Sequence, residues 1–221
     1  MRTTRIKEST AAYYHIMSRV IDRQYLLDTG EKERFRKLMR AAEAFSGVQI
    51  LTYTILDNHF HLLLHVPERE PVSDRELVRR LGCLYDGQFV KGIAKRLRAF
   101  REAEEHESAE ALKRSYAYRM YDISEFAKTL KQRFSQSYNR RHGRRGTLWE
   151  GRFKSLLVQG RECEAEAVGT EALLTVAAYI DLNAVRAGIV QDPKEYRFCG
   201  YARGIGRFEV CARGNQATVA G

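Results

Sequence analysis

The chain has 221 residues, of which 44% are hydrophobic and 30% charged, a composition typical of a globular domain with a substantial core. Its 38 basic and 28 acidic residues give a formal net charge of +10, which indicates a nucleic-acid partner. No apolar run approaches the roughly 20 residues of a membrane span, and no apolar segment follows the basic start. We therefore expect no membrane partner and a cytoplasmic protein. Four widely spaced cysteines without a Cys-x-x-Cys pair argue against a zinc ribbon or a disulfide framework.

The beginning of the chain predicts a strand, a helix and two further strands. Aromatic and β-branched residues predict a strand over 12–20, and apolar residues recurring at three and four positions predict a helix over 30–45. Strands over 48–56 and 59–66, joined by a tight turn at 57–58, predict a hairpin. This order opens a β-α-β-β-α-β core, so we expect an α+β, ferredoxin-like (RRM-like) antiparallel sheet with helices packed on it.

The middle of the chain predicts helices. Ser73 is a candidate N-cap for one helix, and Ser124 is a candidate N-cap for another that carries aromatic residues at helical spacing. Between them, a segment at about 88–119 is rich in both charge signs and poor in large apolar residues, which predicts a solvated helical insertion. We expect one domain over 1–221, with a flexible tail at about 204–221.

Two elements are predicted after the insertion and its following helix. Residues 152–158 predict a returning strand. Apolar residues at helical spacing predict a single helix over 170–187, whose end is marked by Arg186 and Gly188.

The strand predicted at 59–66 carries histidines at alternate positions. His59, His61 and His65 share one face, and Phe60 lies on the other. Two imidazoles at i and i+2 point the same way, a geometry that suits two ligands of one metal ion. A half-exposed strand with solvent-facing histidines explains the same pattern, so both interpretations stay open on this strand alone. We expect His65 to lie outside a ligand set, and His15 on the first strand to pack or hydrogen-bond.

A basic loop follows the aromatic helix. Residues 131–161 contain nine basic residues and one acidic residue. Arginines in such a loop can fork onto phosphates, and Trp149 or His142 could stack on an unpaired base. A solvated loop without a ligand is the alternative. The candidate DNA-binding residues are Lys131, Arg140, Arg141, Arg144, Arg145, Trp149, Arg152 and Lys154.

The last predicted helix carries a tyrosine and an amide four residues apart. Tyr179 and Asn183 therefore share one helix face. A phenolate can attack a phosphodiester when a cation neutralises the phosphate, and two imidazoles with an amide oxygen can hold such a cation. A packed tyrosine with a hydrogen-bonded hydroxyl is the alternative.

Three segments carry a resemblance to a known family: residues 58–63, 146–155 and 179–188. Together they resemble the single-tyrosine HUH transposases (IS200-like), especially the branch associated with repetitive extragenic palindromes. The resemblance implies that His59, His61 and Asn183 bind Mg²⁺ or Mn²⁺ and that Tyr179 is the nucleophile. The family commonly has proline where this chain has Ala184, which we interpret as a change in how the helix ends.

The resemblance implies a metal-dependent single-strand DNA endonuclease and strand transferase, a transposase that forms a 5′-phosphotyrosine. Its expected partners are single-stranded DNA and DNA hairpins, and it would act as a monomer or homodimer. One alternative is a domesticated nucleic-acid-binding protein that does not cleave. Another is a metal-dependent phosphohydrolase, which would need Asp57 or Asp181 as further ligands.

Overall fold

The computed structural model describes residues 11–159 and 166–204. Its chain contacts divide the protein into two compact units, which are described separately. The sheet unit comprises the described residues of Met1–Arg36, Gln49–His65 and Gly146–Gly221, and the helical unit comprises Lys37–Val48 and Val66–Arg145. The tail expected from about residue 204 lies outside the described residues. In the part of the chain that is described, no helix is long and apolar enough to cross a membrane.

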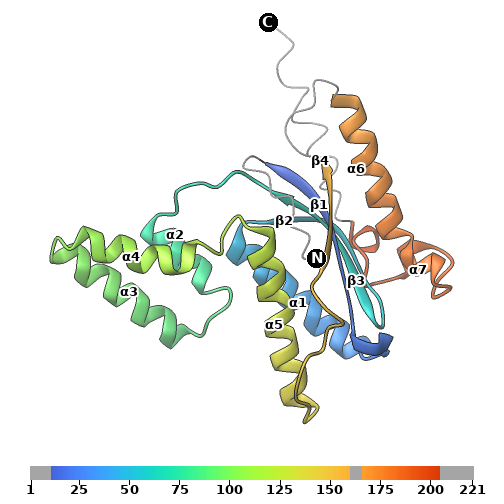
Figure 1. Ribbon diagram of the computed structural model, residues 1–221, viewed down its shortest axis with the longest axis horizontal. Helices are drawn as coiled ribbons and strands as arrows, with labels where there is room; N and C mark the ends of the chain where they lie inside the picture. Colours follow the sequence, from blue (N-terminus) through green and yellow to red (C-terminus); the bar gives the residue numbers. More distant parts are fainter. Residues whose placement is uncertain (1–10, 160–165, 205–221) are drawn as a thin grey trace, which may run out of the picture. The chain divides into compact units, whose positions relative to one another are not determined.

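The sheet unit is built on four strands (Figure 1): β1 (Ala12–Arg19), β2 (Gln49–Ile55), β3 (His59–Val66) and β4 (Lys154–Gln159). Their order is β2-β3-β1-β4, and both β2/β3 and β1/β4 pair antiparallel. This is the strand order that a ferredoxin-like core requires, so the predicted α+β class is confirmed. The strand with the histidines has a neighbour on each side, which fixes its register and therefore the direction of each imidazole.

Both faces of β3 are covered. On one face, Phe60 is fully buried and its ring lies 4.8 Å from Phe35 of α1 (Thr29–Ser46) and 5.5 Å from Trp149, centroid to centroid. On the opposite face, Leu63 packs beneath α6 (Glu166–Asp181), which runs along the sheet in Figure 1. The histidines share this second face, so they lie at the margin of a helix–sheet contact.

The predicted helix over 170–187 is two helices in the structure. α6 ends at Asp181, and the short α7 (Asn183–Arg186) follows after Leu182, which has ψ −1°. Threonine hydroxyls of β2 hold this junction: Thr54 Oγ1 donates to the Ile180 carbonyl at 2.5 Å, and Thr52 Oγ1 donates to Asp181 Oδ1 at 2.6 Å. The expectation of one continuous helix was wrong because these contacts between distant segments determine where α6 ends.

The helical unit contains α2 (Asp74–Leu81), α3 (Gly87–Glu102), α4 (His106–Ala117) and α5 (Ile123–Arg141), together with residues 37–46 of α1. These helices enclose an apolar cluster of their own. It includes the buried residues Phe45, Leu77, Leu81, Ile93, Leu97, Ala109, Leu112 and Met120. The charged segment at 88–119 therefore contributes to a core, which its composition did not indicate.

Two helix starts in this unit test the predicted caps. The Ser73 hydroxyl accepts a hydrogen bond from the Glu76 amide at 3.1 Å, so this N-cap is confirmed. The Ser124 cap was wrong, because Asp122 is the N-cap of α5 and accepts from the amides of Ser124 and Glu125. Ser124 lies within the first turn instead.

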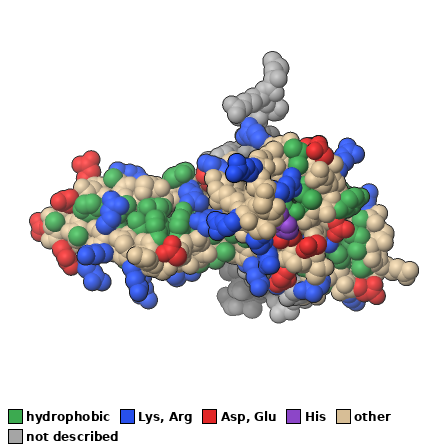
Figure 2. Space-filling model, turned by 90° about the horizontal axis from the view of Figure 1, so that it is seen from below, with side chains coloured by type: hydrophobic (Ala, Val, Ile, Leu, Met, Phe, Trp, Pro, Cys, Tyr) green, Lys and Arg blue, Asp and Glu red, His purple; other side chains and the backbone are tan. Residues whose placement is uncertain are grey.

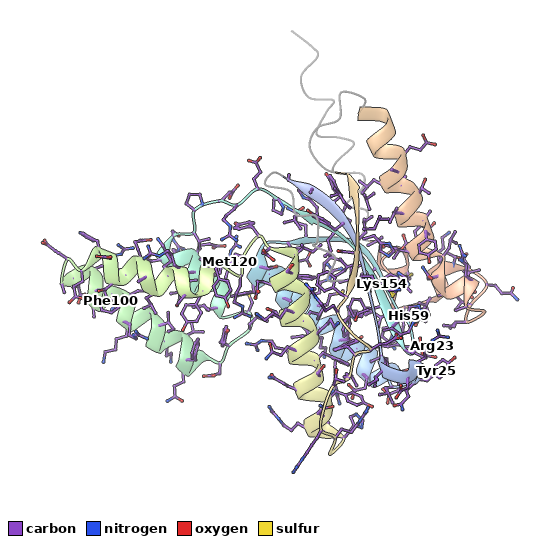
Figure 3. All side chains as sticks on the ribbon, viewed as in Figure 1. Arg23, Tyr25, His59, Phe100, Met120 and Lys154 are labelled. Atoms are coloured by element: carbon purple, nitrogen blue, oxygen red, sulfur yellow. The ribbon has the colours of Figure 1, made fainter. Side chains whose placement is uncertain are left out.

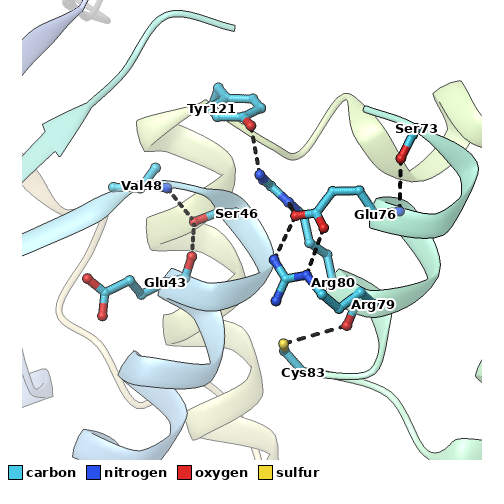
Figure 4. A network of polar contacts seen from close by, with 9 residues as sticks. All are labelled: Glu43, Ser46, Val48, Ser73, Glu76, Arg79, Arg80, Cys83 and Tyr121. Atoms are coloured by element: carbon cyan, nitrogen blue, oxygen red, sulfur yellow. Dashed lines mark hydrogen bonds and ion pairs between the residues drawn. The ribbon is translucent and has the colours of Figure 1, made fainter. Parts of the chain in front are cut away.

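A polar network joins α2 to the segment before α5 (Figure 4). Glu76 accepts from Arg79 and Arg80, and Arg80 Nη2 donates to the Tyr121 hydroxyl at 2.7 Å. Hydrogen bonds from both arginines lower the pKa of Glu76 to about 2. The carboxylate therefore stays charged over the physiological pH range and keeps the two arginines in place.

Replacing Phe60 with alanine should destabilise the sheet unit strongly. Phe60→Ala removes a fully buried ring from between Phe35 and Trp149, a change that costs about 3–5 kcal/mol. Urea denaturation followed by circular dichroism measures the loss. Leu174→Ala is the control because Leu174 is 51% exposed and should change the unfolding free energy by no more than about 0.5 kcal/mol.

Candidate active site

Two of the three proposed metal ligands lie side by side on β3. His59 and His61 have ring centroids 5.2 Å apart, as their spacing of two along a strand requires. His61 is buried, with 5% of its surface exposed, and His59 is half-buried. One imidazole of the pair is therefore shielded from solvent, and the other is partly exposed to it.

Hydrogen bonds orient both imidazoles. His59 Nδ1 lies 2.6 Å from Asn58 Oδ1, and His61 Nδ1 lies 2.9 Å from Nε2 of His15. Because an amide oxygen only accepts, His59 carries its proton on Nδ1 and keeps the lone pair of Nε2 for a ligand. When His61 Nδ1 donates to His15 Nε2, His61 likewise keeps the lone pair of its own Nε2 for a ligand. Such supporting hydrogen bonds are usual for metal-binding histidines, and His15 hydrogen-bonds as expected.

The surroundings favour neutral imidazoles. Burial lowers the pKa of His61 to about 3, helped by the charges of His15, His59 and Arg19. Burial also lowers the pKa of His15, and burial together with Arg19 lowers that of His59. A histidine binds a metal ion in its neutral form, so the site is ready for a cation at neutral pH.

Tyr179 reaches the histidines from the end of α6. Its ring lies edge-on to His61 and His15, with centroid distances of 5.9 and 6.0 Å. Tyr179 is 40% exposed, so part of the residue reaches solvent. The guanidinium of Arg186 lies 5.2 Å from the centre of the Tyr179 ring. The arrangement therefore places a cation beside the candidate nucleophile.

Asn183 is tied to the backbone of the tyrosine. Its Nδ2 donates to the Tyr179 carbonyl at 2.8 Å, and the residue is buried. This bond leaves Oδ1 as the acceptor atom that the side chain can offer to a cation. Among the described residues, no three His, Cys, Asp or Glu side chains form a metal-binding cluster. The candidate set instead combines two neutral imidazoles with an amide oxygen, which are nitrogen and oxygen donors that divalent ions accept.

The two carboxylates that could have extended this set are engaged elsewhere. Asp181 accepts from Thr52 Oγ1 and from the Tyr201 amide, and burial raises its pKa. Asp57 forms an ion pair with Lys32. Both side chains therefore have structural partners within the sheet unit.

The candidate DNA-binding residues differ in how far the structure exposes them to solvent. Arg140, Arg141 and Arg145 are exposed in the helical unit, where Arg144 is half-buried with its guanidinium 5.9 Å from the Tyr138 ring. Arg152 and Lys154 are exposed in the sheet unit.

Two members of the candidate DNA-binding set are buried. Trp149 is 6% exposed, and its ring packs against Phe60 and Phe35. The expectation that it stacks on a base was wrong, because a bridge between Val20 and Trp149 holds it in the core. Lys131 is 9% exposed on α5, so it does not present its ammonium group to a ligand.

His15 and Arg186 also lie beside Tyr179, although the sequence did not indicate either as a site residue. His15 joins the site because β1 is the neighbour of β3, a pairing that the local pattern of either strand does not reveal. Arg186 follows Tyr179 by seven residues, a spacing that repeats one helix face and could have suggested the contact. His65 lies farther along β3 and stacks on Tyr13 at 4.7 Å.

Acid should destabilise the protein through His61. Its folded-state pKa of about 3 lies below the ordinary 6.5, so the unfolded chain takes up the proton first. Stability is therefore complete above pH 6.5 and falls as the pH drops toward 3. At pH 5 the loss from this residue alone is about 2 kcal/mol. Urea denaturation at a series of pH values in EDTA measures it, and His61→Gln should flatten the dependence. An equal slope in both proteins would contradict the assignment.

Comparisons with known proteins support the resemblance seen in the sequence. Residues 8–83 match the family model described as "Transposase IS200 like". A solved structure described as "Structure of the REP associates tyrosine transposase bound to a REP hairpin" is similar in fold, with a TM-score of 0.56 and 14% sequence identity. The alignment covers 94% of this chain and 87% of that one. No curated protein sequence matches the chain significantly.

Proposed function

Because residues 8–83 carry the sequence pattern of the IS200-like transposases, we propose that this protein is a metal-dependent single-strand DNA endonuclease and strand transferase. The observation that carries the proposal is the contact between Tyr179 and His61. The ring of the half-exposed Tyr179 lies 5.9 Å, centroid to centroid, from the buried His61 imidazole, and burial lowers the pKa of that imidazole. A nucleophile beside a metal ligand is the arrangement that phosphodiester transesterification needs.

The proposed reaction conserves the number of phosphodiester bonds. Tyr179 Oη attacks the scissile phosphorus and loses its proton, the bond to the 3′ oxygen breaks, and that oxygen leaves as a 3′-hydroxyl. The 5′-phosphate stays bonded to the tyrosine. Attack by another 3′-hydroxyl reverses the step and joins two strands without an external energy source. Arg186 lies beside the Tyr179 ring and would be a cation available to the phosphate during attack.

We propose that the chain's own residues hold a divalent ion, Mg²⁺ or Mn²⁺. His59, His61 and Asn183 would hold it through Nε2 atoms and an amide oxygen. When bound, such an ion supplies positive charge that neutralises the scissile phosphate. The histidines remain neutral because of burial, and Asn58 and His15 keep their rings in position.

We propose DNA hairpins with a flanking single strand as the substrate. The tyrosine transposase that is similar in fold was solved bound to a REP hairpin. In this chain, exposed arginines at the end of α5 and in the following loop provide cations suited to phosphates, namely Arg140, Arg141 and Arg145. The protein would act on this substrate as a monomer or a homodimer.

A water-activating phosphohydrolase is less well supported. Such an enzyme would need carboxylate ligands beside the histidines, and Asp57 and Asp181 have other partners. A binding protein that has lost cleavage remains the second candidate. The retention of Tyr179, His59, His61 and Asn183 favours the enzyme over it.

The experiment that separates these functions is a search for a covalent complex. The protein is incubated with labelled single-stranded hairpins of varied sequence in Mn²⁺ or in EDTA and then denatured. An endonuclease yields a labelled band that survives denaturation in Mn²⁺ and is absent in EDTA. Binding without any covalent band favours the non-cleaving protein, and metal-dependent cleavage without a band favours the hydrolase.

A further inference from the structure

A basic pocket lies at the end of β1 in the sheet unit, outside the set of residues proposed for catalysis. It has a volume of about 360 Å³, within the range of pockets that hold small ligands. Its lining carries four cationic side chains and one carboxylate, and includes Met17, Arg19, Arg23, Glu150, Arg152 and Lys154. No described carboxylate forms an ion pair with any of the four cations. Among the described residues, the lining therefore carries a net positive charge, which suits an anion.

Backbone hydrogen bonds place this pocket beside His59. The Val20 amide, which follows Arg19, donates to the Asn58 carbonyl at 2.8 Å, and Asn58 precedes His59. The Glu150 amide donates to the Arg19 carbonyl at 3.0 Å, which holds the segment before β4 against the end of β1. Figure 3 shows Lys154, His59 and Arg23 following one another along this end of the sheet. Figure 2 shows several Lys and Arg side chains at the surface of the face that it draws.

The turn after β1 holds an unusual conformation. Asp22 and Arg23 both have left-handed backbones, with φ 53° and 56°, which non-glycine residues rarely adopt. Asn58 supports the turn, because its Nδ2 donates to the Arg23 carbonyl at 3.0 Å while its Oδ1 accepts from His59. One side chain thus joins the strained turn to a candidate metal ligand. Strain of this kind collects at ligand-binding sites.

An exposed aromatic ring continues the same turn. Tyr25 is 79% exposed, two residues after Arg23 (Figure 3). A large ring left in solvent next to a basic pocket is the usual arrangement for single-stranded nucleic acid, in which cations contact the phosphates and the ring stacks on a base.

We propose that this pocket binds the backbone phosphates of the single strand next to the scissile position, and that Tyr25 stacks on one of its bases. The inference rests on the proposed function, since it names the part of the protein that holds that substrate. Asn58 is a positioning residue in this account, because it fixes His59 and the pocket turn together. A strand held by Arg23 and Lys154 is thereby placed beside the histidines, where the phosphodiester must lie.

The test measures binding without cleavage, using fluorescence anisotropy with labelled oligothymidylate in EDTA. Arg23→Gln combined with Lys154→Gln should weaken binding about tenfold or more at low salt. It should also flatten the dependence of log affinity on log salt by about 1.4, the effect of losing two phosphate contacts to a single strand. Tyr25→Ala should weaken binding by about fivefold to a hundredfold, and Tyr25→Phe should restore most of it.

The matched control is Arg96→Gln combined with Arg98→Gln, which removes the same charge from exposed positions on α3. An equal loss of oligothymidylate affinity in the control and in the pocket variant would overturn the proposal, since net charge would then explain the effect. Unchanged binding by the pocket variant would overturn it as well. If the unsubstituted protein forms the covalent band in that case, the proposed function stands without the pocket. If it neither binds nor cleaves single strands, both proposals fail.

Discussion

Tyr179→Phe is expected to reduce the covalent protein–DNA complex below detection while leaving DNA affinity nearly unchanged. The substitution removes the hydroxyl that would bond to phosphorus and keeps the ring that contacts His61 and His15. The fold should be unaffected because the hydroxyl has no described hydrogen-bond partner and 40% of the side chain is exposed. Gel electrophoresis of the denatured complex in Mn²⁺ measures the product, and anisotropy measures affinity.

Tyr118→Phe is the matched control, because Tyr118 is 52% exposed in the helical unit and should retain full activity. Persistence of the covalent band in Tyr179→Phe would contradict the assignment. Tyr138 and Tyr121 would then be the next nucleophiles to test. Both are poorly placed: Tyr138 is buried against His142, and the Tyr121 hydroxyl accepts from Arg80.

The second large effect is expected from the imidazoles of β3. His59→Ala should lower the affinity for Mn²⁺ and the rate of covalent complex formation, each by about 100-fold or more, because it removes one of three ligands. The half-buried position of His59 makes this variant better tolerated than a change at the buried His61. Electron paramagnetic resonance of Mn²⁺ measures binding without relying on activity.

His65→Ala is the control for this experiment, because His65 lies on the same strand but stacks on Tyr13 instead of approaching Tyr179. It should bind Mn²⁺ as the unsubstituted protein does. Equal Mn²⁺ affinity in His59→Ala and the unsubstituted protein would show that the metal site lies elsewhere. A loss of oligothymidylate binding in EDTA by His59→Ala would instead point to a structural defect.

The sequence predicted the sheet because its local patterns are strong. Three features depend only on residues close together in the chain. They are the alternation along β3, the tight turn at Asp57 and Asn58, and the apolar spacing in α1. They gave the order of the first elements along the chain and placed His59 and His61 on one face. The break between α6 and α7 was missed because it depends on Thr52 and Thr54, more than a hundred residues earlier in the chain.

The same reason explains the errors at the ligand-binding surface. Trp149 sits among glycines and arginines in the sequence, a context typical of a loop, yet its pairing with Val20 buries it. The sequence did not indicate Arg23 and Tyr25 as DNA-binding residues, because they lie in a short connection without a motif. Their importance emerges only when Asn58 and the segment before β4 are seen around them.

The central claim is that a bond forms between Tyr179 and a 5′-phosphate of DNA, and peptide mass mapping tests it most directly. The covalent complex is purified under denaturing conditions, digested with nuclease and protease, and fragmented. The account predicts a peptide that contains Tyr179 and carries the mass of a residual nucleotide on that side chain. The same mass on a different residue, or a labelled band that yields no modified peptide, would contradict it.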